Sequence, residues 1–190
     1  MRKCALVTLC VFAAALNAAD GVLSFDDIHG RAQRVFDPHA KATVLIFIST
    51  DCPIANAFAP EINRLCDEYA AKGVAFFLVH TDPALKREQA RQHAQEYALR
   101  APILIDARHV LVKKAGATVT PEAALFSSDE SVQYLGRIND LYVELSRKRY
   151  APLKHDLREA LDALLSGKAV PQPKTTAVGC VIPDLGGDGK

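Results

Sequence analysis

The amino-acid sequence predicts an α/β fold in which a central mixed β-sheet is flanked by helices on both faces. Two apolar runs, at 43–49 and 74–80, are continuous and rich in β-branched and aromatic residues, which is typical of strands buried on both faces. A helical pattern follows each run, and this alternation indicates parallel strands joined by crossover helices. Two more strand-like runs flank the polar segment 128–131 and predict an antiparallel hairpin at the edge of the sheet.

The first half of the chain should contain a short hairpin and a long helix. The hairpin is predicted over 21–37, with its turn near His29 and Gly30. The helix is predicted from Pro53 to about Lys72. Its apolar face recurs every three or four residues and consists of Ile54, Phe58, Ile62, Leu65 and Tyr69.

The second half should add three helices and end in an irregular tail. Helices are predicted over 83–99, with Pro83 at its start, and over 108–116, separated by a short strand at 101–106. A closing helix is predicted over 151–167. Its buried stripe is expected to be Leu153, Leu157, Leu161 and Leu164. The remaining residues, 168–190, are rich in proline and glycine and are expected to be irregular.

Composition and the N-terminus indicate an exported, single-domain protein. The chain has 190 residues, 49% hydrophobic and 24% charged, as expected of one soluble domain with a full core. Residues 1–19 read as a signal peptide, because a basic start precedes an apolar stretch too short to span a bilayer and a run of small residues. An uncleaved anchor is the alternative. We expect a domain at 20–167, a tail at 168–190, a periplasmic or extracellular location, and no stable membrane association after cleavage.

Charge and cysteine content narrow the function classes. Loss of Arg2 and Lys3 with the signal would change the formal net charge from +1 to about −1, so nothing suggests a nucleic acid partner. The mature chain keeps Cys52, Cys66 and Cys180. In an oxidising compartment each of these should be paired, buried or functional. No cofactor and no metal ion is expected.

Cys52 has the position of a reactive thiol. It follows the buried strand at 43–49 and comes immediately before Pro53, the expected start of a helix. Free N–H groups and the positive end of the helix dipole favour the thiolate at such a place. The pKa of cysteines so placed can fall from about 8.5 to roughly 3.5–7.5. The alternative is a structural cysteine buried at the end of a strand.

Two prolines strengthen the case for a reactive site. Pro60 lies deep in the predicted helix, where it removes a hydrogen bond and should kink the helix. Thr120-Pro121 precedes the strand "EAALF". An X–Pro bond is the one kind for which the cis form is cheap, and a trans proline that opens the strand is the alternative.

These residues resemble the thioredoxin superfamily in its redoxin branch, the alkyl hydroperoxide reductase/thiol-specific antioxidant family. The resemblance covers about residues 22–165. Its marks are Cys52-Pro53, Pro60 eight residues later, Asp82, Thr120-Pro121 and the strand "YLGRIND". It implies a thioredoxin-like fold, Cys52 as nucleophile, and a cis-proline loop at Thr120 and Pro121 that faces it. The motif "CPIAN" with a tail bearing "VGC" also resembles an exported bacterial subgroup of redoxins.

Cys180 is the expected resolving partner of Cys52. A second cysteine usually stands three residues after the first in such a site, but here that residue is Ala55. Cys66 lies 14 residues along the same helix, roughly 21 Å away, whereas a disulfide needs Cα atoms within about 7 Å, so Cys66 is expected in the core. The 13 residues from Gly167 to Cys180 can span up to about 45 Å, enough to reach the site. An idle or intermolecular thiol in a disordered tail is the alternative.

Four further residues are candidates for tuning the site: Ser49, Thr50, His80 and Arg137. His80 ends the strand beside that of Cys52 and could tune the thiolate or shuttle a proton, although a polar residue at the rim of the sheet is the plainer interpretation. The other histidines show no clustering and are expected at the surface. They are His29, His39, His93, His109 and His155.

The favoured function is thiol–disulfide exchange on a protein or small-molecule disulfide, with an external thiol as reductant. Peroxide reduction through a sulfenic acid is the first alternative. The resemblance argues against it, because the peroxidases of this family have proline and threonine where Leu45 and Ser49 stand here, and Arg137 is the nearest substitute for their arginine. A non-enzymatic role is the second alternative. Copper-delivery proteins of this fold need a second cysteine where Asn56 stands, and a scaffold could hold a partner by a mixed disulfide.

Overall fold

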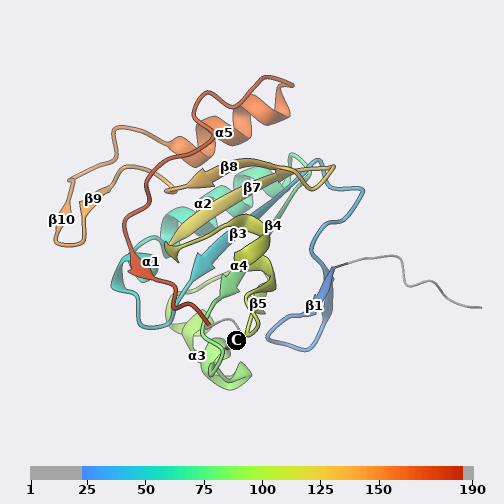
Figure 1. The fold of residues 1–190 in the computed structure, drawn as a ribbon, viewed down its shortest axis with the longest axis vertical. Helices are drawn as coiled ribbons and strands as arrows, with labels where there is room; N and C mark the ends of the chain where they lie inside the picture. Colours follow the sequence, from blue (N-terminus) through green and yellow to red (C-terminus); the bar gives the residue numbers. More distant parts are fainter. Residues whose placement is uncertain (1–22, 186–190) are drawn as a thin grey trace, which may run out of the picture.

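The computed structural model describes residues 23–185, and the predicted signal segment 1–19 lies outside them (Figure 1). The centre of the fold is one five-stranded mixed sheet with the order β5-β4-β3-β7-β8. Its parallel strands are β3 (Ala42–Ile48), β4 (Val74–His80) and β5 (Ile103–Ile105). Its antiparallel strands are β7 (Glu122–Ser127) and β8 (Val132–Gly136). The predicted mixed sheet and its edge hairpin are confirmed.

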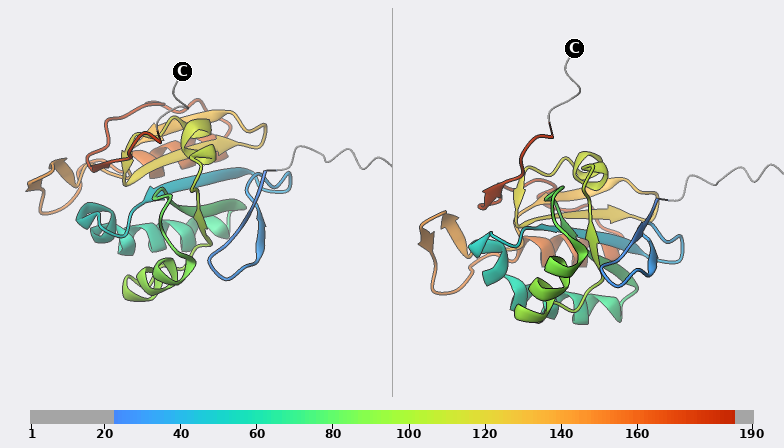
Figure 2. Two further views of the ribbon diagram at one scale, coloured as in Figure 1. Left: turned by 60° about the horizontal axis from the view of Figure 1, so that its bottom comes forward. Right: turned by 90° about the horizontal axis from the view of Figure 1, so that it is seen from below.

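Helices cover both faces of this sheet, as predicted (Figure 2). The helices are α1 (Pro53–Ala57), α2 (Ala59–Ala70), α3 (Arg87–Glu96), α4 (Val110–Ala115) and α5 (Asp156–Leu165). Alternate residues of β3 divide between two cores: Val44 and Ile46 pack with α1, α2, α3 and α5, and Leu45 and Phe47 pack with α4. All seven residues of β3 are buried, which explains why its sequence is continuously apolar.

The predicted helix over 53–72 is broken at Phe58. Pro60 lies in the first turn of α2, where its missing N–H costs no hydrogen bond. The break therefore makes α1 a separate short helix whose N-terminus carries Cys52.

Two other helices begin later than the sequence suggested. The segment 82–85 is a turn, in which Asp82 accepts a hydrogen bond from the Ala84 N–H at 2.8 Å, so α3 does not start at Pro83. Asp140 accepts hydrogen bonds from the backbone N–H groups of Leu153 at 2.7 Å and Lys154 at 2.9 Å, which keeps them out of α5. The side chain of Leu153 is consequently 76% exposed and not part of the buried stripe.

Two hairpins lie outside the central sheet. The first pairs β1 (Ser24–Asp26) with β2 (Ala32–Arg34) and confirms the hairpin predicted over 21–37. The second pairs β9 (Tyr142–Glu144) with β10 (Arg147–Lys148) and was not predicted. Within residues 23–185, no helix has the length and apolar character needed to cross a membrane.

Most of the described tail has no regular secondary structure, as predicted, but it packs against the domain along a defined path. Residues 171–182, here called the tail strap, cross the end of the sheet and finish in β11 (Cys180–Val181), which pairs antiparallel with β6 (Val119–Thr120) (Figure 1). Backbone hydrogen bonds link Leu135 to Pro173 at 2.9 Å and to Thr175 at 3.1 Å. These contacts fix the strap beside β8 before it reaches β6.

Two glycines allow the strap to lie this close to the domain. A Cβ at Gly136 would collide with Thr175, and a Cβ at Gly179 would collide with the Thr120 carbonyl. Any larger residue at these two positions would separate the strap from the domain.

Candidate functional site

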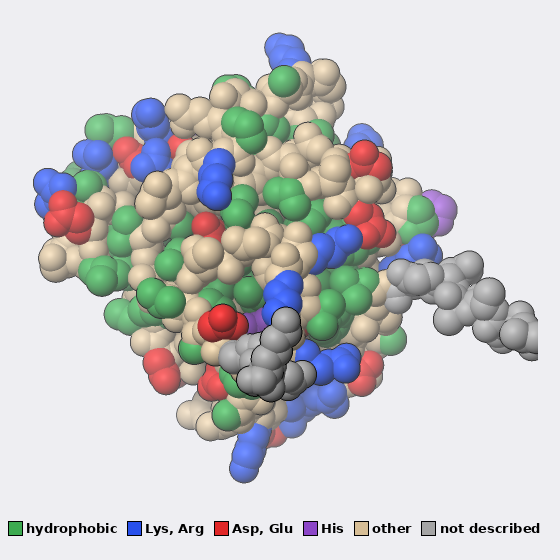
Figure 3. All heavy atoms as spheres, in the orientation of Figure 1, with side chains coloured by type: hydrophobic (Ala, Val, Ile, Leu, Met, Phe, Trp, Pro, Cys, Tyr) green, Lys and Arg blue, Asp and Glu red, His purple; other side chains and the backbone are tan. Residues whose placement is uncertain are grey.

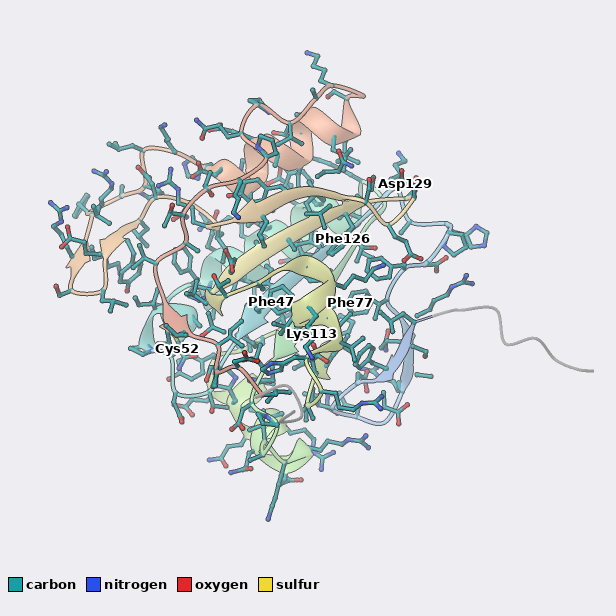
Figure 4. All side chains as sticks on the ribbon, in the orientation of Figure 1. Phe47, Cys52, Phe77, Lys113, Phe126 and Asp129 are labelled. Atoms are coloured by element: carbon teal, nitrogen blue, oxygen red, sulfur yellow. The ribbon has the colours of Figure 1, made fainter. Side chains whose placement is uncertain are left out.

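Cys52 is the N-cap residue of α1 and is only 1% exposed. Its sulfur accepts a hydrogen bond from the Ala55 N–H at 3.4 Å, and its own N–H donates to the Ser49 carbonyl at 3.4 Å. Figure 4 labels Cys52 at this end of the sheet, beside the strap. The predicted placement of the thiol at a helix N-terminus after a buried strand is therefore confirmed.

The loop at Thr120 and Pro121 faces Cys52. The Thr120–Pro121 peptide bond is cis, as predicted. The Thr120 carbonyl oxygen accepts a hydrogen bond from Cys52 Sγ at 2.9 Å. Residues 68 positions apart in the sequence thus meet at one sulfur atom.

The strap brings Cys180 to the same place. Cys180 is the register partner of Thr120, and its carbonyl accepts a hydrogen bond from Thr120 Oγ1 at 3.5 Å. Cys180 is partly exposed, and Cys52, Cys66 and Cys180 are all free thiols. Thr120 therefore contacts both Cys52 and Cys180.

The two thiols of the pair have opposite acid–base character. Burial raises the pKa of Cys52, but hydrogen bonds from the Cys180 thiol, the Ala55 N–H and Thr120 outweigh it and lower that pKa below its usual value. Burial and the neighbouring Cys52 sulfur raise the pKa of Cys180 to about 11. Cys52 is therefore the more acidic thiol of the pair and the one that more readily forms a thiolate.

Cys66 is a core residue, as predicted. It is buried in α2, and burial raises its pKa to about 12. A thiol with so little thiolate is a poor nucleophile at neutral pH.

A chain of polar contacts braces the loop that carries Cys52, and sequence reasoning missed it. Asn56 donates from Nδ2 to the Thr50 carbonyl at 2.9 Å, and its Oδ1 lies 2.8 Å from His93 Nε2. Since Asn56 Oδ1 can only accept, His93 carries its proton on Nε2. The position of Asn56 within "CPIAN" was the signal that could have identified it.

Two histidines expected at the surface are buried. His93 is 5% exposed in α3, and His109 is 3% exposed, with Nε2 2.7 Å from the Thr81 carbonyl. Each can be buried because one of its ring nitrogens contacts a polar partner inside the protein. These partners are distant in the sequence, so looking for clusters of histidines did not reveal them. His29 and His39 are exposed, as predicted, and His155 is half-buried.

His80 is fully buried and is not a rim residue. Neither of its ring nitrogens has a hydrogen-bond partner within the described chain, and its ring packs edge-on against His93 with centroids 5.1 Å apart. Burial, with a contribution from His93, lowers the pKa of His80 to about 3. His80 is therefore neutral at physiological pH. It packs against His93, which contacts the loop that carries Cys52 through Asn56.

Arg137 is held by an acidic partner. Its Nε and Nη2 atoms donate to the two carboxylate oxygens of buried Asp156 at 2.8 and 3.0 Å, and the hydrogen bond raises the pKa of Arg137. This bidentate pair ties β8 to the start of α5.

Glu122 is a second residue that sequence reasoning missed. Its buried carboxylate accepts hydrogen bonds from the backbone N–H groups of Thr118 at 2.7 Å and Val119 at 3.4 Å. It thereby fixes β6, which presents Thr120 to Cys52. A charged residue that opens the apolar run "EAALF" was the available signal.

Sequence comparison identifies the family to which these residues point. The profile of the AhpC/TSA family matches residues 17–135, more than half of the chain. No curated protein matches the chain.

Solved structures share the fold. An uncharacterized conserved protein from Geobacillus kaustophilus is 28% identical, with a TM-score of 0.72, over 85% of this chain and 87% of that chain. A hypothetical protein from Sinorhizobium meliloti is 25% identical, with a TM-score of 0.72, over 85% and 90%. A secreted disulfide oxidoreductase from Mycobacterium tuberculosis, homologous to E. coli DsbE, is 18% identical, with a TM-score of 0.54, over 74% and 95%. The predicted thioredoxin-like fold is thus confirmed.

Proposed function

The chain belongs to the AhpC/TSA family, and from this premise we propose that it is a thiol–disulfide oxidoreductase with Cys52 as nucleophile and Cys180 as resolving partner. The observation that carries the proposal is the pairing of β11 with β6. It sets Cys180 opposite Thr120, whose carbonyl bonds the Cys52 thiol at 2.9 Å. The missing local cysteine at Ala55 is thereby replaced by one from the tail.

In the first step, the Cys52 thiolate attacks one sulfur of a substrate disulfide. A new S–S bond joins Cys52 to the substrate, and the other substrate sulfur leaves as a thiolate. The Ala55 N–H and the Cys180 thiol favour the reactive form of Cys52, because both donate hydrogen bonds to its sulfur.

In the second step, Cys180 attacks the sulfur of Cys52. The mixed disulfide breaks, the substrate sulfur departs and takes the proton that Cys180 loses, and a Cys52–Cys180 disulfide forms. The substrate has then been reduced by two electrons. An external thiol reductant returns the protein to its dithiol form.

The tail strap controls access to this chemistry. Cys52 is 1% exposed with the strap in place. A bulky substrate disulfide therefore reaches Cys52 only after β11 separates from β6, and the return of the strap delivers Cys180 to the mixed disulfide.

Peroxide reduction is the second candidate, and the burial of Cys52 favours it, because a peroxide is small enough to enter where a protein disulfide is not. Cys52 would attack a peroxide oxygen and become a sulfenic acid, and Cys180 would then condense with it and release water. Leu45 and Ser49 argue against this function, because the peroxidases of this family have proline and threonine at these two positions. Arg137 does as well, because its guanidinium is occupied by Asp156.

Export to the periplasm or the cell exterior is part of the proposal. The signal-like character of residues 1–19 supports it, and so does the secreted Mycobacterium tuberculosis disulfide oxidoreductase, which shares the fold. A disulfide-permissive compartment also suits the proposed reaction.

Peptide mapping of the oxidised full-length protein tests the proposal. We expect a reversible Cys52–Cys180 disulfide, mixed disulfides that accumulate in Cys180→Ser, and no change in Cys66→Ser, the matched control. Stopped-flow rates with a model disulfide and with hydrogen peroxide separate the two candidates. A free Cys180 in protein that turns over at the wild-type rate would contradict the proposed resolving role, and a peroxide rate far above that of a free thiolate would favour the peroxidase.

A further inference from the structure

The loop that carries Cys52 joins β3 to α1 and consists of residues 49–52. Its own backbone holds it loosely. The Cys52 N–H donates to the Ser49 carbonyl at 3.4 Å, whereas an N–H···O distance normally lies between about 2.7 and 3.2 Å. The hydrogen bond from the Ala55 N–H to the Cys52 sulfur, at 3.4 Å, depends on where this loop places Cys52. Another contact is therefore needed to fix the loop.

Asn56 in α1 supplies this contact. Its Nδ2 atom donates to the Thr50 carbonyl at 2.9 Å, a normal hydrogen-bond distance. Its backbone N–H donates to the Cys52 carbonyl at 3.0 Å. One residue thus holds the loop at two points, one on each side of the exposed Asp51. Because both bonds start from α1, they fix Cys52 relative to the N–H groups at the start of that helix.

His93 in α3 determines which way the Asn56 side chain points. Its Nε2 atom lies 2.8 Å from Asn56 Oδ1, which can only accept a hydrogen bond. An amide turned end for end would set its oxygen against the Thr50 carbonyl, where neither atom can donate. The His93 ring is itself held in place, because it packs against His80 and Tyr97 with centroids at 5.1 and 4.9 Å. It is buried, and histidine covers only small areas of the face drawn in Figure 3.

The position of Cys52 on α1 affects its acidity. Burial raises the pKa of Cys52, and hydrogen bonds from the Cys180 thiol, the Ala55 N–H and Thr120 lower it below its usual value. Cys180 and Thr120 belong to β11 and β6, and Ala55 alone of the three belongs to α1. The Ala55 N–H is therefore the donor whose distance from the sulfur depends on the contacts of Asn56.

We propose that Asn56 is a positioning residue for the nucleophile Cys52. Its side chain, oriented by His93, holds the Thr50 carbonyl, and this contact keeps the sulfur within reach of the Ala55 N–H. Asn56 acts through the backbone of the loop and not by contact with a substrate. The inference rests on the proposed function, since the position of Cys52 matters for the reaction only if Cys52 is the nucleophile.

Asn63 in α2 is a matched control for Asn56. It is buried, and its amide also makes two hydrogen bonds, one donated to the Ala98 carbonyl at 2.8 Å and one accepted from the Arg100 N–H at 3.2 Å. These bonds tie α2 to the segment that follows α3 and do not involve the loop that carries Cys52. Asn56→Ala and Asn63→Ala should therefore both lower the midpoint of urea unfolding, and Asn56→Ala alone should alter Cys52.

The test follows the alkylation of Cys52 by iodoacetamide against pH in the reduced full-length protein, with mass spectrometry of the Cys52 peptide as the readout. In Asn56→Ala the rate near pH 6 should fall by about threefold or more. A weaker N–H···S bond raises the pKa of Cys52, and each unit of that rise leaves about tenfold less thiolate. Above the pKa of both proteins the two rates should converge. A loop that had merely loosened would instead expose the thiol and raise the rate at every pH. Asn63→Ala should follow the wild-type curve.

Replacement of His93 tests the same contact from α3 and does not require Asn56→Ala to fold. His93→Phe keeps an aromatic ring but has no donor for Asn56 Oδ1, so its curve should shift as in Asn56→Ala. His93→Gln retains an amide donor and should shift the curve less.

The inference is overturned by a wild-type or a uniformly faster curve in Asn56→Ala, by an equal shift in Asn63→Ala, by a wild-type curve in His93→Phe, or by identical curves in the two His93 variants. These curves need no substrate. A failure of the proposed oxidoreductase function would therefore appear in the peptide mapping of the oxidised protein and not in the alkylation of Cys52.

Discussion

The Thr120 carbonyl oxygen accepts a hydrogen bond from Cys52 Sγ at 2.9 Å. Thr120 is also the register partner of Cys180 in the β6–β11 pair. One residue therefore touches both the reactive sulfur and the strand that covers it, so a change on either side of Thr120 should be felt on the other.

Replacement of Cys180 should alter the acidity of Cys52. In Cys180→Ala the thiolate loses a hydrogen-bond donor, so the pKa of Cys52 should rise and its thiolate should form at higher pH. Cys180→Ser keeps a hydroxyl donor and should shift the pKa less. The ultraviolet absorbance of the thiolate, followed against pH in the reduced protein, gives the result. Identical curves for the wild type and Cys180→Ala would mean that the Cys180 thiol does not donate to Cys52.

Gly179→Ala should release the tail strap, because the new Cβ would collide with the Thr120 carbonyl. Cys52 alkylation should become about tenfold faster or more, because the strap would no longer shield the thiol from the reagent. The Cys52–Cys180 disulfide should fail to form on oxidation. Thr176→Ala, at an exposed position of the same strap, serves as the control and should behave as the wild type. Unchanged alkylation in Gly179→Ala would show that the strap does not guard Cys52.

Asn56→Ala should weaken the fold through the brace. It leaves the Thr50 carbonyl and His93 Nε2 without their partner, which should lower the free energy of unfolding by about 1–3 kcal/mol. Urea unfolding measures the loss, and the exposed His29→Ala should change stability by no more than about 0.5 kcal/mol. Equal midpoints for the two variants would indicate that the contacts of Asn56 contribute little.

His80 should make the protein sensitive to acid. Its pKa is about 3 in the folded protein and about 6.5 when unfolded, so between these values the unfolded state binds more protons. Stability should therefore be fully present above pH 6.5 and fall towards pH 3, with a slope of at most about 1.4 kcal/mol per pH unit from this one group.

His80→Leu should flatten this part of the stability curve. Because neither ring nitrogen of His80 has a partner in the described chain, the apolar replacement should cost little stability near pH 7. Urea unfolding at a series of pH values measures the effect, and His39→Leu, at an exposed site, should leave the curve unchanged. A wild-type slope in His80→Leu would assign the acid sensitivity to other groups.

The sequence predicted those parts of the site that depend on local rules. Cys52 lies at a helix N-terminus because a buried strand and Pro53 flank it in the chain, and the break at Phe58 follows from Pro60. The cis bond before Pro121 was expected because the resemblance to the thioredoxin superfamily implies a cis-proline loop at this Thr-Pro. Each of these conclusions uses residues that are neighbours in the sequence.

The sequence did not predict the parts that depend on distant contacts. The order of the strap comes from its pairing with β6 and β8, some 40 to 60 residues away, and a proline- and glycine-rich composition does not reveal such partners. Buried His93 is explained by Asn56, 37 residues earlier. Exposed Leu153 fits a helical period, but the hydrogen bonds to Asp140 stop the helix from reaching it.

The tail strap also fixes the local concentration of the second thiol. A cysteine on a flexible tether reaches its target at an effective concentration on the order of millimolar. Here the strap is further held by backbone hydrogen bonds at Leu135 and Thr118, so Cys180 samples a smaller volume than a free tether would allow. A dissolved thiol would have to exceed that concentration to reach a mixed disulfide on Cys52 first. The outcome of each turnover should thus depend little on how much free thiol the surroundings contain.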